Sequence, residues 1–303
     1  MQTSKSVLSD IPVPPPFELL VAAQNEWYTQ PIPCQARGGA DTAISIGQSF
    51  FLGIGGPDTP DLGAFLGKTQ AEVERRIRAF LNQHPEVNRL TPAIVIMDIE
   101  DPHPRDFHVH PERTQDRLID AFAIRGAAAR RAFPNAKLGF YGTLIPDERG
   151  RPADKVFQRR ARALVRAGER GMFDDVDCLI PVAYPRFGPT DGAAWNTYAA
   201  YTRLAITGSR ALRKSNGTAL PVVPLLTYSI ANGASNHHED LLLDLPVRDP
   251  IGATLAVQGR VLVEEKVDFA VFWVGEDSDL ITRLPNPNKR TVTQHLCGRR
   301  SLR

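Results

Sequence analysis

The stretch Ala93–Pro104, Ala-Ile-Val-Ile-Met-Asp-Ile-Glu-Asp-Pro-His-Pro, constrains the fold more than any other part of the chain. Its apolar and mostly β-branched run lacks polar alternation, which is typical of a strand covered on both faces in a parallel sheet. Side chains alternate along a strand, so we predict that Asp98 and Glu100 share one face at its carboxyl end. Pro102 and Pro104 then end the strand, because proline cannot donate to a ladder. Acids also begin ordinary loops, but three acids within four residues favour a functional site.

Predicted strands alternate with predicted helices along most of the chain. Including the central stretch, strands are predicted at 17–23, 48–54, 93–100, 136–141, 176–183, 220–227 and 267–274, and helices at 70–81, 114–133, 154–168, 193–207 and 250–263, with 30–47 as a long loop. This alternation indicates a parallel sheet. No Gly-x-Gly-x-x-Gly follows the first strand and no phosphate-binding loop is present, which weighs against an open nucleotide-binding sheet. We therefore predict an α/β fold, a single β/α barrel of the TIM type with seven strands.

The length and composition fit one globular domain. A barrel of this kind takes about 250 residues, and we assign it to residues 17–282 of the 303, between a proline-rich N-terminal arm (1–16) and a basic C-terminal tail (283–303). With 36 basic and 34 acidic residues, the net charge of +2 makes no case for nucleic acid or membrane partners. No apolar run has the length of a membrane span, and the N-terminus shows no signal-peptide core. We expect a cytoplasmic protein, one exported by a non-classical route, or part of a particle.

Cysteine and histidine give no sign of a metal or cofactor. Cys34, Cys178 and Cys297 are too few and too far apart for a disulfide framework or a Cys-based metal site, and Cys178 is expected in the core. Two groups of histidines fall in predicted loops, and no His-Glu-x-x-His occurs on a predicted helix. They are His103, His108 and His110 after the acids, and His237 and His238 later in the chain. We interpret them as solvated loop residues and predict no metal and no cofactor.

Polar and aromatic residues recur where the predicted strands stop. They are Asn25, Trp27, Asp98, Glu100, Tyr141, Tyr184, Tyr228, Trp273 and Glu276. In a closed barrel these strand ends converge on one bowl. Aromatic faces cover the C–H surfaces of sugars and an acid can protonate a glycosidic oxygen, so the set suits a carbohydrate site. Each aromatic residue alone would be an ordinary half-buried barrel residue.

The motifs at these strand ends resemble, in order and placement, those of the family 56 glycoside hydrolases, the hyaluronidases. They are Met-Asp98-Ile-Glu100, Gly-Phe-Tyr141-Gly, Pro-Val-Ala-Tyr184-Pro, Pro-Leu-Leu-Thr-Tyr228 and Phe-Trp273-Val-Gly. The first predicted strand, which ends in Gln24-Asn25-Glu26, also looks like that family's first strand. The resemblance spans residues 17–280 and implies a distorted seven-stranded barrel.

The resemblance implies hydrolysis of a polysaccharide that contains N-acetylhexosamine. Glu100 would be the general acid and base, and the nucleophile would be the substrate's own acetamido carbonyl. Asp98 would hold and polarise that acetamide, helped by Tyr184 or Tyr228, and its charge would favour the protonated form of Glu100. Trp273 would line the acetyl pocket, and Asn25 and Tyr141 would be further substrate-binding residues.

The departures from the family leave the substrate open. Asp101 directly follows Glu100 and disfavours an anionic polymer such as hyaluronan, so chitin-like polymers and peptidoglycan are further candidates. The animal hyaluronidases are exported and disulfide-bonded, and neither feature is visible here.

Two other functions remain alternatives. A lysozyme-like muramidase also places Asp-x-Glu at a strand end, but it needs an Asp after the first strand, where Asn25 or Glu26 stands. A non-catalytic barrel could bind glycans or serve in a larger assembly, with the N-terminal arm and C-terminal tail docking onto protein partners. The intact acid pair weighs against this last reading.

Overall fold

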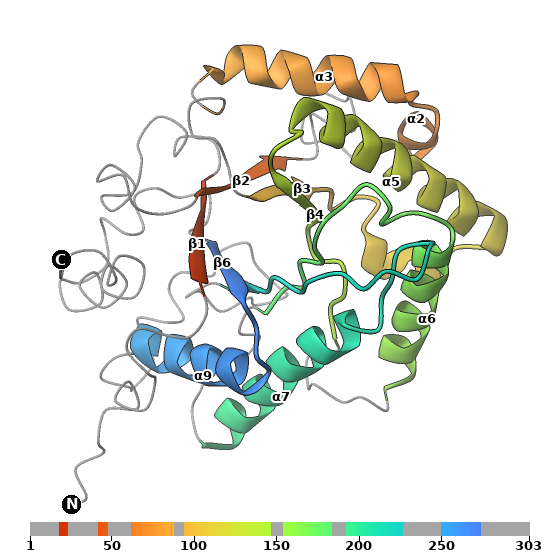
Figure 1. Cartoon of the computed structure of the whole chain (residues 1–303). Helices are drawn as coiled ribbons and strands as arrows, with labels where there is room; N and C mark the ends of the chain where they lie inside the picture. Colours follow the sequence, from red (N-terminus) through yellow and green to blue (C-terminus); the bar gives the residue numbers. More distant parts are fainter. Residues whose placement is uncertain are drawn as a thin grey trace, which may run out of the picture.

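The computed structural model describes residues 18–23, 42–47, 62–85, 87, 94–146, 154–183, 192–226 and 250–273. They contain parallel strands and helices. The elements are β1 (Glu18–Ala23), β2 (Thr42–Gly47), α2 (Leu62–Leu66), α3 (Gln70–Gln83), β3 (Ile94–Asp98), η3 (Pro104–Val109), α5 (Glu112–Ala132), β4 (Lys137–Phe140), α6 (Lys155–Glu169), α7 (Gly192–Ser209), β5 (Leu225–Leu226), α9 (Pro250–Glu264) and β6 (Phe269–Trp273). Helices α3, α5, α6, α7 and α9 lie around the outside of the strands (Figure 1). The predicted terminal arm and tail lie outside the described residues.

The described strands pair in the order β4-β3-β2-β1-β6-β5, and each pair is parallel. Parallel neighbours need long crossover connections, and the described helices lie in the connections that follow β2, β3, β4 and β5. Single parallel bridges also join the 179–182 stretch to Tyr141 on one side and to Val222 and Leu225 on the other. The described strands therefore form one open parallel sheet, with helices around it. These ladders alone do not establish the predicted closed barrel.

The predicted strand at 176–183 forms only these bridges. Its Leu179 N–H donates to Pro221 O at 2.9 Å and its Ala183 N–H to Leu225 O at 2.9 Å, so part of a ladder is present. Pro181 has no N–H to donate, and neither do Pro221 and Pro224 on the adjoining stretch. Proline interrupts a ladder in this way, and the described strand β5 begins only after Pro224.

The two faces of the sheet pack against different groups. Val95, Met97 and Ile99 belong to the main core between the sheet and the helices. Ile94 and Ile96 belong to a smaller cluster, the inner cluster, which gathers residues from strands and strand ends only. Its fully buried members are Ala43, Ile94, Ile96, Cys178, Ile180, Val223, Leu225 and Val271. Such a cluster forms where the inner faces of several strands converge.

The predicted long loop at 30–47 was wrong at its end. Residues 42–47, predicted as loop, form β2, while 48–54 lie outside the described residues. In β2 the small residues Ala43 and Ser45 alternate with Ile44 and Ile46, and all four are buried. Small buried residues lower the apparent hydrophobicity of a strand, which explains the error.

The predicted helices are confirmed, and two of them have the expected caps. Thr69 and Glu72 form a capping box at α3, with Thr69 N–H donating to Glu72 Oε2 at 2.8 Å. The carboxylate of Asp154 caps α6 by accepting from the N–H groups of Val156 and Phe157 at 2.8 and 3.0 Å.

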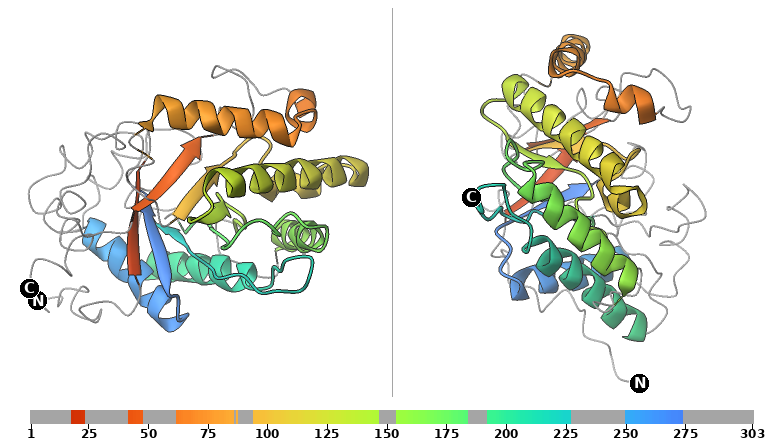
Figure 2. Two further views of the ribbon diagram at one scale, coloured as in Figure 1. Left: turned by 45° about the horizontal axis from the view of Figure 1, so that its top comes forward. Right: turned by 90° about the vertical axis from the view of Figure 1, so that its right-hand side faces the viewer.

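Helices α5, α6 and α7 run side by side over the outer face of the sheet (Figure 2). Phe122 of α5 is central to this packing, with ring centroids 5.5 Å from Phe65, 5.3 Å from Phe107 and 5.2 Å from Phe140. These rings connect α2, η3 and β4 to one helix, so β4, the strand that follows α5, is packed firmly against that helix.

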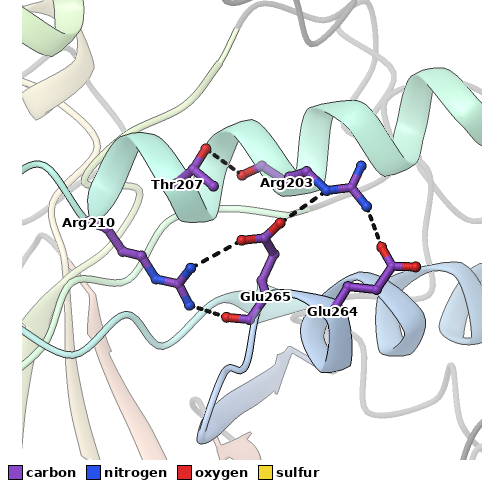
Figure 3. A network of polar contacts seen from close by, with 5 residues as sticks. All are labelled: Arg203, Thr207, Arg210, Glu264 and Glu265. Atoms are coloured by element: carbon purple, nitrogen blue, oxygen red, sulfur yellow. Dashed lines mark hydrogen bonds and ion pairs between the residues drawn. The ribbon is translucent and has the colours of Figure 1, made fainter.

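An ionic network joins α7 to the end of α9 (Figure 3). Glu265 accepts from Arg203 Nε at 3.0 Å and from Arg210 Nη1 at 3.1 Å, and Arg203 also pairs with Glu264. The next residue, Lys266, has a positive φ of 51°, and β6 begins three residues later. The network therefore fixes the turn that leads into β6.

Candidate active site

Asp98 lies at the carboxyl end of β3, as predicted. It follows Ile94 and Ile96 on one strand face, and both of these belong to the inner cluster. Its side chain is half-buried, and Ser45 Oγ of β2 donates to Asp98 Oδ2 at 3.4 Å. Ser45 is fully buried and was missed, because its strand had been predicted as a loop.

Neighbouring strands place Gly47 and Tyr141 on either side of Asp98. Gly47 of β2 is in register with Asp98. On the other side, Tyr141 N–H donates to Met97 O at 3.0 Å, directly after the ladder between β3 and β4. The Tyr141 ring packs against the inner cluster and is half-buried. Within the described residues, a Cβ added to Gly47 would meet no atom within 4 Å.

Glu100 lies just beyond the end of β3. The strand ends at Asp98, Ile99 joins Val95 and Met97 in the main core, and Glu100 is exposed in the following loop. The strand is therefore shorter than predicted, and the shared face of Asp98 and Glu100 stays a prediction. The two carboxylates are still only two residues apart, with Asp98 half-buried and Glu100 open to solvent.

The interpretation of the nearby histidines as solvated was wrong for His103, of which only 4% is exposed. It caps η3, where its Nδ1 accepts from the N–H of Arg105 at 3.0 Å. His108 is half-buried, and its Nδ1 lies 2.9 Å from Arg105 O. Desolvation lowers the pKa of His108, although the hydrogen bond to Arg105 O acts in the opposite direction. Among the described residues, no three His, Cys, Asp or Glu side chains gather in a way that could hold a metal ion.

The other predicted site residues are placed only in part. Trp273 is the last residue of β6 and is in register with Ala22 of β1, so its backbone stands at a strand end as predicted. Asn25, Tyr184 and Tyr228 lie outside the described residues. Of the predicted set, the structure therefore brings together Asp98, Glu100 and Tyr141.

A buried polar cluster, also missed by the sequence analysis, holds the chain just before Tyr184. Ala183 O accepts from Tyr198 Oη at 2.8 Å and from Gln258 Nε2 at 3.0 Å. Complete burial raises the pKa of Tyr198 well above its ordinary value, so the phenol stays protonated and donates. The two side chains come from α7 and α9, which are far apart in sequence, so no local pattern reveals the pairing.

Cys178 is buried, as predicted, and belongs to the inner cluster. Burial raises the pKa of its thiol to about 12, which keeps the thiol protonated and unreactive. None of the helices in the described ranges combines the length and apolar character that a membrane crossing requires.

Two of the solved structures with a similar fold are of bee venom hyaluronidase. Bee venom hyaluronidase aligns with a TM-score of 0.56 at 12% identity, over 91% of this chain and 95% of that one. The same enzyme in complex with a hyaluronic acid tetramer aligns with a TM-score of 0.54 at 13% identity, over 92% and 96%. A psychrophilic glycoside hydrolase family 10 endo-beta-1,4-xylanase aligns over 90% and 89% at 15% identity, with a TM-score of 0.37.

The sequence itself gives no such match: no family model matches it, and a comparison with curated protein sequences finds none either. The likeness to bee venom hyaluronidase is therefore one of fold. It confirms, at that level, the resemblance that the strand-end motifs indicated.

Proposed function

We propose that this chain is a glycoside hydrolase that cleaves a polysaccharide containing N-acetylhexosamine, with Glu100 as general acid and base. One observation carries the proposal: Asp98 stands beside Tyr141 at the carboxyl end of β3, with Glu100 two residues further on. The likeness of fold to a hyaluronidase that was solved with a hyaluronic acid tetramer supports a polysaccharide as substrate.

The exposure of the two acids suits their different roles. Glu100 is open to solvent, so it can reach the glycosidic oxygen of a polymer lying across the edge of the sheet. Asp98 is half-buried and accepts a hydrogen bond from Ser45, which orients its carboxylate. An oriented and partly desolvated carboxylate is suited to hold a substrate group in one position.

The reaction then takes two steps. Glu100 gives its proton to the leaving oxygen while the substrate's acetamido oxygen attacks the anomeric carbon and the glycosidic bond breaks. Asp98 accepts a hydrogen bond from the acetamide N–H and stabilises the positive charge of the cyclised intermediate. Glu100, now a carboxylate, takes a proton from water, which attacks the same carbon and reopens the ring with retained configuration.

We propose further that the sheet closes into a distorted seven-stranded barrel. The 179–182 stretch would be the seventh strand between β4 and β5, since it forms parallel bridges toward both. The inner cluster supports this, because it joins Cys178 and Ile180 to residues of β2, β3, β5 and β6.

The test is product analysis by mass spectrometry with hyaluronan, chitin oligomers and peptidoglycan as substrates. The wild type, Glu100→Gln and Glu169→Gln are compared. Glu169 is an exposed residue at the far end of α6 and serves as a matched control. New saccharide ends from the wild type and Glu169→Gln, but not from Glu100→Gln, are the expected result. A folded wild type that cleaves none of the three polymers would favour a non-catalytic binding barrel.

A thiazoline mimic of the cyclised intermediate tests acetamide participation. We expect strong competitive inhibition, since such mimics resemble the species that the site stabilises. An active enzyme that ignores the mimic would instead use a second carboxylate as nucleophile.

A further inference from the structure

His103 joins the loop that carries Glu100 to the end of β4. It follows Glu100 by three residues and is buried. Its Nδ1 accepts the Arg105 N–H at 3.0 Å, which fixes the ring at the first turn of η3. A hydrogen-bond acceptor at this position requires an unprotonated Nδ1, so the imidazole is bound in one orientation.

The end of β4 is shaped to admit this ring. The imidazole and the Tyr141 ring meet edge to face, with centroids 6.0 Å apart and an interplanar angle of 67°. At Gly142, which has a φ of +61°, a Cβ would lie 2.7 Å from His103 Nε2 and 2.8 Å from Cε1. No larger residue fits at 142 without moving His103, so the contact between loop and strand is close.

The alternative is that His103 only fills the core. In that case removing the ring would lower stability, but its effect on kcat would not depend on Tyr141. The two contacts of His103 are also separable: the cap needs the acceptor, whereas the contact with Tyr141 needs the ring.

We propose that His103 is a positioning residue that holds the Tyr141 ring against the loop of Glu100. The inference rests on the proposed function, in which Tyr141 contacts substrate and Glu100 transfers the proton. Because His103 belongs to the loop and contacts the end of β4, losing the ring lets Tyr141 and Glu100 move relative to each other. Displacements of about 1 Å at a reacting centre can lower a rate about a hundredfold.

The test is a double-mutant cycle on kcat and KM with the polymer that the wild type cleaves. His103→Asn keeps an acceptor for the Arg105 N–H and removes the ring, whereas His103→Phe keeps a ring and removes the acceptor. His108→Asn, on the same short helix, is the matched control. We expect His103→Asn to lower kcat at least about tenfold with little change in KM, His103→Phe to retain more activity, and His108→Asn to match the wild type.

The second arm uses Tyr141→Ala alone and combined with His103→Asn. If His103 acts through Tyr141, the double variant is no slower than Tyr141→Ala. Multiplicative losses, or a folded His103→Asn enzyme with wild-type kcat, would overturn the inference. A wild type that cleaves nothing would instead overturn the proposed function. In that case non-additive thermal unfolding temperatures in the same cycle would still report the contact between the two rings.

Discussion

Gly139→Ala should destabilise the protein because it crowds the inner cluster between β4 and the 179–182 stretch. A Cβ at this position would lie 2.6 Å from Ile180 Cδ1, 2.7 Å from Ile180 Cγ1 and 3.0 Å from Cys178 O. Carbon atoms in contact are normally about 3.5–4.0 Å apart, so Ile180 would have to retreat by about 1 Å. Ile180 is fully buried and Cys178 O is backbone, which leaves little room to relax. We expect the free energy of unfolding to fall by about 2 kcal/mol, within the usual range for overpacking.

Equilibrium urea unfolding followed by circular dichroism measures this loss. Gly47→Ala is the matched control, because the same methyl group would meet no described atom within 4 Å in the neighbouring part of the sheet. Its unfolding free energy should stay within about 1 kcal/mol of the wild type, on the stabilising side.

Ile180→Val tests the cause, since it removes the methyl group closest to the added Cβ. Alone it should cost about 1 kcal/mol, but in the Gly139→Ala background it should cost less or restore stability. The expected coupling is about 1 kcal/mol. A Gly139→Ala variant as stable as the wild type, or additive effects in the cycle, would refute the packing of 179–182 against β4.

Three further changes probe other parts of the fold by the same unfolding assay. Lys266→Gly should stabilise the protein by about 1 kcal/mol, because Lys266 has a φ of 51°, which strains a residue with a Cβ. Lys266→Ala keeps the Cβ and should not stabilise the protein. Arg125 is fully buried over the Phe65 ring, and desolvation lowers the pKa of Arg125 to about 9. Arg125→Lys should therefore be less stable than Arg125→Met, since lysine keeps the buried charge and loses the planar contacts; the reverse order would contradict this. Burial raises the pKa of Cys178 to about 12, so the folded state holds the thiol proton more tightly than the unfolded state does. The free energy of unfolding is therefore unaffected by this thiol below about pH 9 and falls between pH 9 and about 12. Cys178→Ala should show a shallower loss than the wild type across that interval, and equal slopes would show that the thiol does not contribute.

Local patterns in the sequence predicted the helices well. The capping box at Thr69 and the cap at Asp154 are short-range signals, and both caps form as expected. The long apolar run at β3 also identified a buried strand and placed Asp98 at its end. These features depend on neighbouring residues, which is why a single sequence reveals them.

The errors arose where distant residues decide the outcome. β2 is made of small residues whose burial depends on neighbouring strands, so it was predicted as a loop. The central strand was predicted to run on to Glu100, because nothing before Pro102 indicates that β3 stops at Asp98. The burial of His103 depends on Gly142, which lies almost forty residues further along the chain. Among the site residues, Ser45 was missed for the same reason, since its contact with Asp98 spans two strands.

The most direct test of the proposed role of Glu100 is to measure turnover and oligosaccharide binding on the same preparation of Glu100→Gln. A general acid and base contributes to the chemical step more than to binding. The rate should therefore fall at least about a hundredfold, while calorimetry gives a Kd close to that of the wild type. A Glu100→Gln protein that binds and turns over its substrate like the wild type would contradict the assignment of Glu100.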